Sequence, residues 1–467
     1  MKLRTLTILL FFICFTGVFG QNKSIKYVLK HSVNSEHIEI SILLDSLNTN
    51  QAMLMIPRSG PGTYDLTDYL AFFTNVKGYT ESNNVLKGII GRGSFFIFKE
   101  ENEVLKKISY EVNIKKMEND LLGGFASSKL RDNYLGILGY SVFGFIDGLE
   151  NNPIVLEINT HKDWPIFSTL KPSKNRKLGS AFYEINNYAL LADAQYLLGT
   201  NVQILEINEA KIPLFVAVYS ETPINIDEIG RRGLLTLKGL ANYFGYVPMP
   251  HYTFCYEFLI PFSDRHSYGF SMEHLNSMTA SFDTSRAIVE YDPKAQIGSM
   301  VHHMGHSWVP LRSYGTGYRP FEWQTAPLIE TIWLNEGFTW YVAMYHVLEN
   351  KSILKFFNNV LESAPMYIQK KSLRELSLLG STQYSMDFNI GRNLFSRGAL
   401  LAHQLDLEIL KKTDGKKSFK DAMLALLRWT EINQRAFEYN EIESIISNGV
   451  GVDISEIWNR WQEPMIK

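Results

Sequence analysis

The spacing of the apolar residues changes once along this chain, and that change constrains the fold most strongly. Between Lys26 and about Thr222 apolar and polar residues alternate, as from His37 to Ile42, and clusters of turn-forming residues interrupt the alternation. Alternation of this kind predicts strands that bury one face. From Asp227 onward apolar residues recur at helical spacing, for example from Arg231 to Tyr243. The sequence therefore predicts a β domain followed by a mainly helical region.

The chain is long enough to form several domains. Its 467 residues exceed the roughly 250–300 residues that one hydrophobic core organises. The sequence contains no internal repeat, low-complexity tract or flexible linker, so we expect domains that dock rigidly. We place the domains at residues 21–200, 201–385 and 386–467, after a separate segment at 1–20.

Residues 1–20 are a predicted secretory signal peptide. A basic stretch from Met1 to Arg4 precedes an apolar run from Leu6 to Val18, and the small residue Gly20 precedes Gln21. Cleavage there predicts a secreted or periplasmic protein, and an uncleaved anchor is the alternative. The apolar run is shorter than the ~20 residues of a membrane span and no later run reaches that length, so no membrane span is expected.

Charge and cysteine content narrow the expected partners and cross-links. The chain has 46 basic and 48 acidic residues, and no basic run or basic patch interleaved with aromatic residues. Nucleic acid and anionic membranes are therefore not expected partners. Of the two cysteines, Cys14 lies in the signal peptide, so the mature chain keeps Cys255 alone and no intrachain disulfide is expected. Cys255 lies in the strand-like run from Tyr252 to Ile260, where we expect it to be a small buried apolar residue.

Two histidines form the first part of a candidate metal site. His302 and His306, in the run HHMGH, are spaced so that both imidazoles lie on one face of a helix and reach one zinc ion. Asp292 resembles an N-cap before Pro293, and no further proline occurs until Pro310. This pattern predicts a helix that begins at Pro293 and ends near Pro310.

A single carboxylate in an aromatic-rich segment completes the candidate site. Glu336 lies within the run from Thr331 to Tyr341 and has the chemistry of a third ligand. Two histidines and one carboxylate are the ligand set of a catalytic zinc site that leaves the fourth position to water. We therefore expect one zinc ion per chain. The alternative is that His302 and His306 only pack or cap a helix and that Glu336 is solvated.

Several further motifs resemble the glycyl aminopeptidase family of gluzincins, also called M61. The matching stretches are the degenerate HHMGH, Met272-Glu273-His274 for the end of GGxEH, Trp333 to Thr339 for the third-ligand helix, Pro320-Phe321-Glu322-Trp323 for PFDY, Arg397 to Leu400 for KGAL and Pro61 to Tyr64 for PGxY.

The resemblance implies a multidomain α+β fold. It implies an N-terminal all-β, sandwich-like domain at 21–200, a thermolysin-like catalytic domain at 201–385 and a C-terminal helical bundle at 386–467. Members of this family often carry a C-terminal PDZ domain. This sequence stops at Lys467, within a helical pattern, so we expect that module to be absent.

The resemblance also assigns substrate-binding residues, namely Phe270, Ser271, Met272 and Glu273. Glu273 stands at the family's amine-gripping glutamate, so peptides or proteins with free N-termini are the expected ligands. An ordinary carboxylate at the end of a strand is the alternative for Glu273. Phe270 and Ser271 replace the family's glycine pair, so a phenyl ring stands where a substrate backbone would approach closely.

Two departures from the family affect the chemical step. His303 replaces the glutamate that acts as general base, and Phe395 stands where the family has its oxyanion-stabilising tyrosine. Loss of a positioned base costs about 10²–10⁴ in rate, and loss of one oxyanion donor about 10²–10³. The two losses need not multiply, because groups that act together are not additive.

The sequence therefore favours a secreted relative of the M61 peptidases with impaired catalysis that retains zinc and N-terminus binding. One alternative is an active zinc aminopeptidase that removes small residues such as glycine or alanine, with His303 or another residue as base. A second alternative is a non-enzymatic interaction protein that acts through its β domain. Metal content separates this second alternative from the other two, and turnover of glycyl substrates separates an impaired from an active peptidase.

Overall fold

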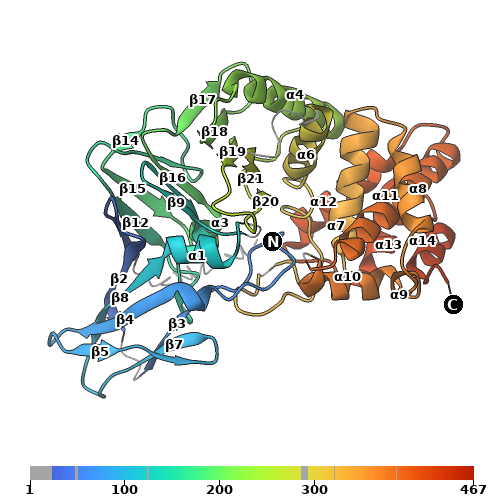
Figure 1. Cartoon of the computed structure of the whole chain (residues 1–467). Coiled ribbons are helices and arrows are strands. Elements are labelled where there is room, and N and C mark those ends of the chain that lie inside the picture. Colours follow the sequence, from blue (N-terminus) through green and yellow to red (C-terminus); the bar gives the residue numbers. More distant parts are fainter. Residues whose placement is uncertain are drawn as a thin grey trace, which may run out of the picture.

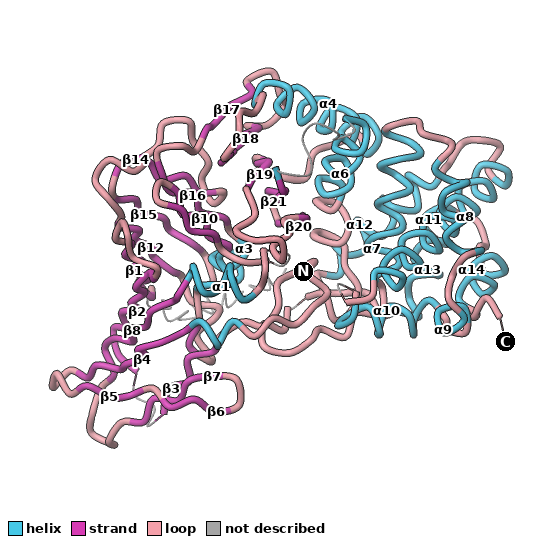
Figure 2. The backbone as a smooth tube through the Cα atoms, in the orientation of Figure 1, coloured by secondary structure: helices cyan, strands magenta, loops and turns pink. Residues whose placement is uncertain are grey.

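The computed structural model describes residues 24–47, 51–123, 126–284, 293–319, 321–384 and 386–466. The predicted signal peptide, Asp292 and Pro320 lie outside the described residues. Strands lie on one side of the molecule and helices on the other (Figure 1 and Figure 2). Within the described ranges, no helix is long and apolar enough to cross a membrane.

The N-terminal region consists of three sheets and a few short helices. The first sheet has the order β15 (Ser180–Ile185), β12 (Ile154–Asn159), β1 (Ile25–His31), β2 (His37–Leu47), β8 (Leu105–Asn113), β4 (Phe73–Thr80) and β5 (Val85–Lys87). The second has the order β14 (Lys177–Leu178), β13 (Pro165–Ser168), β16 (Gln195–Gly199), β10 (Tyr134–Leu138) and β9 (Lys129–Arg131). The third has the order β11 (Phe145–Ile146), β3 (Gln51–Met55), β7 (Ser94–Phe98) and β6 (Ile89–Gly91). The helices are η1 (Tyr69–Phe72), α1 (Ile114–Asp120), α2 (Gly139–Val142) and α3 (Tyr188–Asp193).

The three sheets bury their apolar faces in one shared core. Ile40 of β2, Leu54 of β3 and Tyr196 of β16 are all fully buried in the same cluster. Alternate residues of β8 face this core, as the period in the sequence predicts. Burial of one such aliphatic side chain stabilises the fold by about 1.5–3 kcal/mol.

A fourth, mixed sheet follows the β domain. Its order is β17 (Gln203–Ile207), β18 (Leu214–Ser220), β19 (Tyr252–Leu259), β21 (Ser277–Asp283) and β20 (Gly269–His274). The three central strands are parallel, and β20 pairs antiparallel with β21 at one edge. Two helices cover one face: α4 (Ile226–Phe244) and α6 (Pro293–Gly305).

The other face of this sheet packs on the β domain. Tyr219 of β18 stacks on Tyr134 of β10 with ring centroids 3.8 Å apart. Cys255 of β19 is buried in the same cluster and is unpaired, as predicted. Because both faces of the sheet are covered, its central strands read as almost continuous apolar runs.

The last part of the chain is helical. Its elements are α7 (Ile332–Trp340), the π-helix η2 (Tyr341–Val347), α8 (Ile353–Glu362), α9 (Met366–Gln369), α10 (Leu373–Gln383), α11 (Phe388–Lys412), α12 (Phe419–Asn433), η3 (Tyr439–Glu441), α13 (Ile442–Val450) and α14 (Ser455–Gln462). The mixed α+β, multidomain fold predicted from the sequence is therefore confirmed.

Two glycines bring α7 and α11 unusually close together. A Cβ at Gly398 would lie 2.0 Å from the Trp333 carbonyl oxygen, and one at Gly337 would lie 2.5 Å from the Cα of Gly398. No larger residue fits between these backbones. Gly337 directly follows Glu336, so this contact determines where that carboxylate lies.

Helix α6 ends earlier than the sequence pattern predicts. The predicted end was near Pro310, whereas the helix ends at Gly305 and tighter turns follow. Pro310 has no N–H to donate, and the residue before a proline is disfavoured in the helical conformation. His306 still donates its backbone N–H to the His302 carbonyl at 3.1 Å, so the spacing of the two side chains remains helical.

Candidate metal centre

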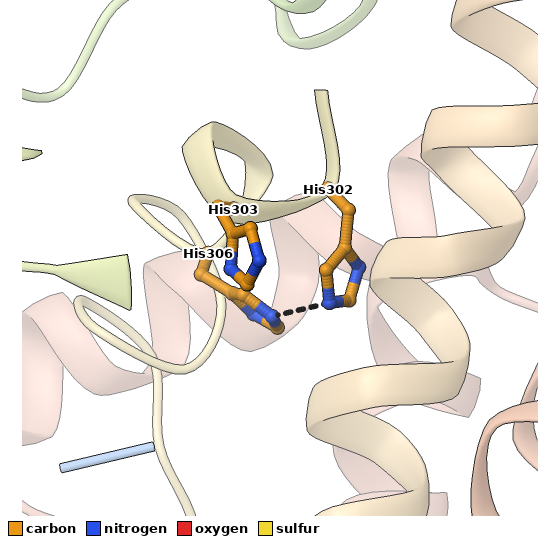
Figure 3. Close-up of side chains that lie close together, drawn as sticks. All are labelled: His302, His303 and His306. Carbon is orange, nitrogen blue, oxygen red and sulfur yellow. Dashed lines mark hydrogen bonds between the residues drawn. The ribbon is translucent and has the colours of Figure 1, made fainter. Parts of the chain in front are cut away.

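The two predicted histidine ligands point at each other from the last turn of α6. The Nε2 atoms of His302 and His306 are 3.0 Å apart (Figure 3). Their rings are almost perpendicular, with an interplanar angle of 75°. The period of the helix brings both side chains to one face, as their spacing predicts.

Glu336 reaches the same point from α7. Its Oε2 atom lies 3.1 Å from Nε2 of His302 and 3.5 Å from Nε2 of His306. In a tetrahedral zinc site with bonds of about 2.0–2.1 Å, ligand atoms lie about 3.3–3.4 Å apart. The geometry and donor types of His302, His306 and Glu336 therefore fit a zinc ion.

Surrounding side chains hold these three in place. Nδ1 of His306 donates to the Val309 carbonyl at 3.0 Å, which leaves Nε2 as the atom that faces the site. The Trp340 ring stacks on His302 with centroids 4.5 Å apart. The Tyr64 hydroxyl donates to Oε1 of Glu336 at 3.0 Å. Tyr64 belongs to the N-terminal β domain, so both domains build this site.

The buried charges affect one another's protonation. Burial lowers the pKa of His302 to about 3, and the charge of His306 acts in the same direction. Burial also opposes the charge of His306, but Glu273 and Glu336 outweigh it and raise the pKa of His306 to about 9. The charge of His306 in turn holds the pKa of Glu336 well below its usual range, against the effect of burial. Because a metal ligand must be the neutral imidazole, cation binding by His306 would depend on pH.

Glu273 lies beside this site at the end of β20 and is buried. Its Oε2 atom is 3.6 Å from Nδ1 of His303, and its Oε1 atom has no hydrogen-bond partner among the described residues. Gly62, with φ of +83°, closes over Oε1 so tightly that a Cβ there would lie 2.5 Å away. A buried carboxylate oxygen without a donor costs at least about 1–3 kcal/mol, so this position suits a cationic ligand group.

His303, at the position where the resemblance implies the general base, contacts strand β20. Its Nε2 atom lies 2.9 Å from the Ser271 hydroxyl oxygen, and the opposite nitrogen faces Glu273. The ligand atoms of His302, His303 and His306 also lie within 4.8 Å of one another. His303 is therefore within reach of an ion held by the other two histidines (Figure 3).

Phe395 lies where the resemblance placed it, on the wall of the site. Its ring centroid is 6.2 Å from that of His302 and 6.1 Å from that of Trp340. It presents no hydroxyl group. Tyr384, which the sequence patterns did not indicate, packs against Phe395 with centroids 5.7 Å apart. Burial raises the pKa of Tyr384, and the carboxylates of Glu336 and Glu273 raise it further.

A cavity of about 400 Å³ opens onto these groups. Its walls come from the loop at Tyr64, from Phe270 and Ser271 of β20, and from Phe388 and Phe395 of α11. Its volume lies at the lower end of the usual range for small-ligand sites, about 300–1,000 Å³.

Met272 is the one predicted substrate-binding residue that lies elsewhere. Its side chain is buried in the β-domain core, with its sulfur 3.9 Å from the Tyr140 hydroxyl. Successive side chains of a strand point to opposite faces, so Ser271 and Glu273 face the cavity and Met272 faces away. Its assignment to the substrate-binding set is therefore corrected.

Comparison with known proteins agrees with the sequence resemblance. Residues 27–200 match the peptidase M61 N-terminal domain. These residues therefore form a peptidase M61 N-terminal domain. The whole chain is similar in fold to an aminopeptidase N family protein from Idiomarina loihiensis, with a TM-score of 0.79 and 17% identity over 95% of this chain and 76% of that one. It is also similar to an M1 zinc metallopeptidase mutant from Deinococcus radiodurans bound to a Tyr-Ser-Ala substrate, with a TM-score of 0.57 and 10% identity over 96% of this chain and 95% of that one.

These structural likenesses show that the chain has a metallopeptidase fold. No curated protein matches the chain by sequence. The resemblance to M61 that the short motifs predicted is confirmed for residues 27–200.

Proposed function

We propose that this protein binds one zinc ion and the free N-termini of peptides, and that its metal-dependent peptide hydrolysis is slow or absent. One observation carries the proposal. His302, His306 and Glu336 keep the spacing of zinc ligands, while His303 in the base position contacts Ser271 and Glu273.

The donor set supports zinc as the bound ion. Two imidazole nitrogens and one carboxylate oxygen are the protein ligands of many catalytic zinc sites. Bound zinc would polarise a substrate carbonyl there. The M1 structure from Deinococcus radiodurans, which shares this fold, is that of a zinc metallopeptidase.

The unpartnered oxygen of Glu273 supports recognition of an α-amine. A protonated amine would supply the donor that Oε1 lacks in the described structure. A charge-assisted hydrogen bond is worth about 1.5–3 kcal/mol, or roughly 10- to 100-fold in affinity. The cavity, at about 400 Å³, lies in the volume range of small-ligand sites. We further propose that residues 1–20 direct export and are removed.

The loss of two chemical groups supports weak hydrolysis. An imidazole at 303 is a poorer proton acceptor than a carboxylate beside a divalent cation, because the cation disfavours its protonated form. Phe395 provides no hydroxyl for the oxyanion. His303 and Phe395 line the same cavity, so both substitutions affect the same reaction.

An active aminopeptidase is the second candidate, and Tyr384 is the observation that favours it. Tyr384 lines the cavity next to Phe395 and has a hydroxyl. In that case Tyr384 would stabilise the oxyanion and His303 would act as base. Turnover of a glycyl substrate at an ordinary kcat of about 1–10³ s⁻¹, lost in His303→Ala, would establish this candidate and exclude impaired catalysis.

Metal analysis and calorimetry test the proposal. Protein purified without chelator should hold close to one zinc per chain, and His302→Ala should abolish it. A glycyl peptide should bind about 10- to 100-fold more tightly than its acetylated form, and Glu273→Gln should remove the difference. Absence of zinc, or equal binding of the free and acetylated peptides by the unaltered protein, would contradict the corresponding half of the proposal.

A further inference from the structure

We propose that Ser271, His303 and Glu273 form a nucleophile, base and carboxylate that make this cavity reactive toward carboxylic esters without a metal ion. This activity goes beyond the proposed function, in which Ser271 has no role. It arises from the same substitution that impairs the metal-dependent chemistry, because only a histidine at 303 can link the other two side chains.

Strand β20 and helix α6 place Ser271, His303 and Glu273 close together. Ser271 and Glu273 are two residues apart on β20, so both face the cavity side of the strand. His303 of α6 lies between them. Its Nε2 atom is 2.9 Å from the Ser271 oxygen, within the 2.6–3.2 Å expected of a nucleophile and its base. Its Nδ1 atom is 3.6 Å from Oε2 of Glu273, just beyond hydrogen-bond distance, and has no hydrogen-bond partner among the described residues.

The Glu273 carboxylate favours one tautomer of His303. An ionised carboxylate only accepts hydrogen bonds, so the favourable tautomer of His303 has its N–H at Nδ1, facing Glu273. Nε2 then presents a lone pair to the Ser271 hydroxyl. This is the division of roles in a serine, histidine and acid triad, in which the acid orients the ring and the ring accepts the serine proton.

A substrate can reach the nucleophile. Ser271 is only partly buried and lines the cavity, and the neighbouring Phe270 provides an apolar wall. Tyr384 lines the same cavity and carries a hydroxyl group. The cavity, at about 400 Å³, fits the acyl group of a small ester.

The reaction is balanced with water as the only co-reactant. Oγ of Ser271 bonds to the ester carbonyl carbon while its proton moves to Nε2 of His303. The ester C–O bond breaks, and the alcohol leaves with the proton from Nε2. Water then attacks the acyl-serine and gives a proton to Nε2. Oγ leaves the carboxylic acid product and recovers that proton.

A fluorophosphonate probe, which forms a stable bond to activated serines, tests the assignment on the mature protein. We expect one adduct per chain on Ser271, located by peptide mass mapping, in protein freed of metal by a chelator, because this reaction needs no metal ion. Ser271→Ala should abolish the adduct. His303→Gln, which keeps a polar side chain of similar size, should slow labelling about 10²–10⁴-fold because the base is lost.

Controls separate this chemistry from misfolding and from the zinc proposal. Ser267→Ala alters an exposed serine of the same segment and should label at the unaltered rate. Ser271→Cys should restore a nucleophile, and iodoacetamide should alkylate it faster than it alkylates the same variant combined with His303→Gln. Zinc content and peptide binding are measured on the same samples, so the two proposals fail independently. No adduct on Ser271 of the unaltered protein, labelling only elsewhere, or equal labelling after His303→Gln would overturn the inference.

Discussion

Replacing Gly398 by alanine tests how the fold holds the third zinc ligand. In α11, a Cβ at this position would lie 2.0 Å from the Trp333 carbonyl oxygen and 3.0 Å from the Cα of Gly337, whereas ordinary contact begins near 3.4 Å. Both obstacles are backbone atoms of α7, which cannot rotate away. We therefore expect the two helices to separate locally by about 1 Å, because a close-packed interior has no free space to absorb the added methyl group.

The expected cost follows from this displacement. Overpacking of this kind costs about 1–3 kcal/mol, which exceeds the ~1 kcal/mol that alanine gains over glycine in a helix. Oε2 of Glu336 lies 3.1 Å from Nε2 of His302, and zinc ligands tolerate shifts of only about 0.2 Å. Zinc affinity should fall at least about 10- to 100-fold, the usual effect of disturbing the support of a ligand. The melting temperature should fall by about 2–4 °C for each kcal/mol lost.

Competition with a chromophoric chelator measures the affinity, and thermal unfolding of metal-free protein measures the stability. Gly298→Ala is the matched control, because the nearest atom to its new Cβ is the sulfur of Met344 at 3.2 Å, the flexible part of a side chain. That variant should bind zinc as tightly as the unaltered protein. If Gly398→Ala also keeps the original affinity and melting temperature, the contact between α7 and α11 does not position Glu336 and the reasoning fails.

Three further outcomes are expected. His303→Glu combined with Phe395→Tyr should raise zinc-dependent turnover of a glycyl substrate more than either change alone. An effect no larger than that of the single variants would show that other features block hydrolysis. Tyr64→Phe should lower zinc affinity about 10- to 100-fold, because Glu336 loses the hydroxyl that donates to it at 3.0 Å; unchanged affinity in a chelator competition would contradict this. Burial lowers the pKa of His31 to about 4. As the pH falls, the unfolded chain therefore takes up a proton at this histidine before the folded chain does. The free energy of unfolding should fall by up to about 3 kcal/mol between pH 6.5 and pH 4. Denaturant unfolding of His31→Gln over the same range should lack this component, and an identical pH dependence in both proteins would refute it.

Features that depend on local chain geometry were predictable from the sequence. The spacing of His302 and His306 places both rings on one helix face, whatever the helix packs against, because the helical period alone decides it. The alternation in β8 and the helical spacing in α4 likewise follow from which residues are apolar. The motif at Glu336 indicated the third ligand through resemblance to a family, and the match to the M61 N-terminal domain and the α+β fold are confirmed.

The end of α6 and the direction of Met272 were predicted less well. The sequence shows where a proline forbids a helix but not where the helix stops before it, since capping contacts and packing decide the last turn. Met272 was grouped with its neighbours by motif, although strand alternation turns its side chain away from the cavity.

The contacts that decide what the site can do come from distant parts of the chain. Tyr64 reaches Glu336 across 272 residues of sequence, and Ser271 meets His303 only because β20 and α6 pack side by side. Local patterns carry no information about such pairs, because their distance depends on how sheets and helices dock. By itself, then, the sequence indicated the resemblance to M61, the helix that carries the histidines and the presence of a histidine at position 303. Only the tertiary structure decided that His303 contacts Ser271 and approaches Glu273, since no spacing along the chain encodes a contact between two separately folded elements.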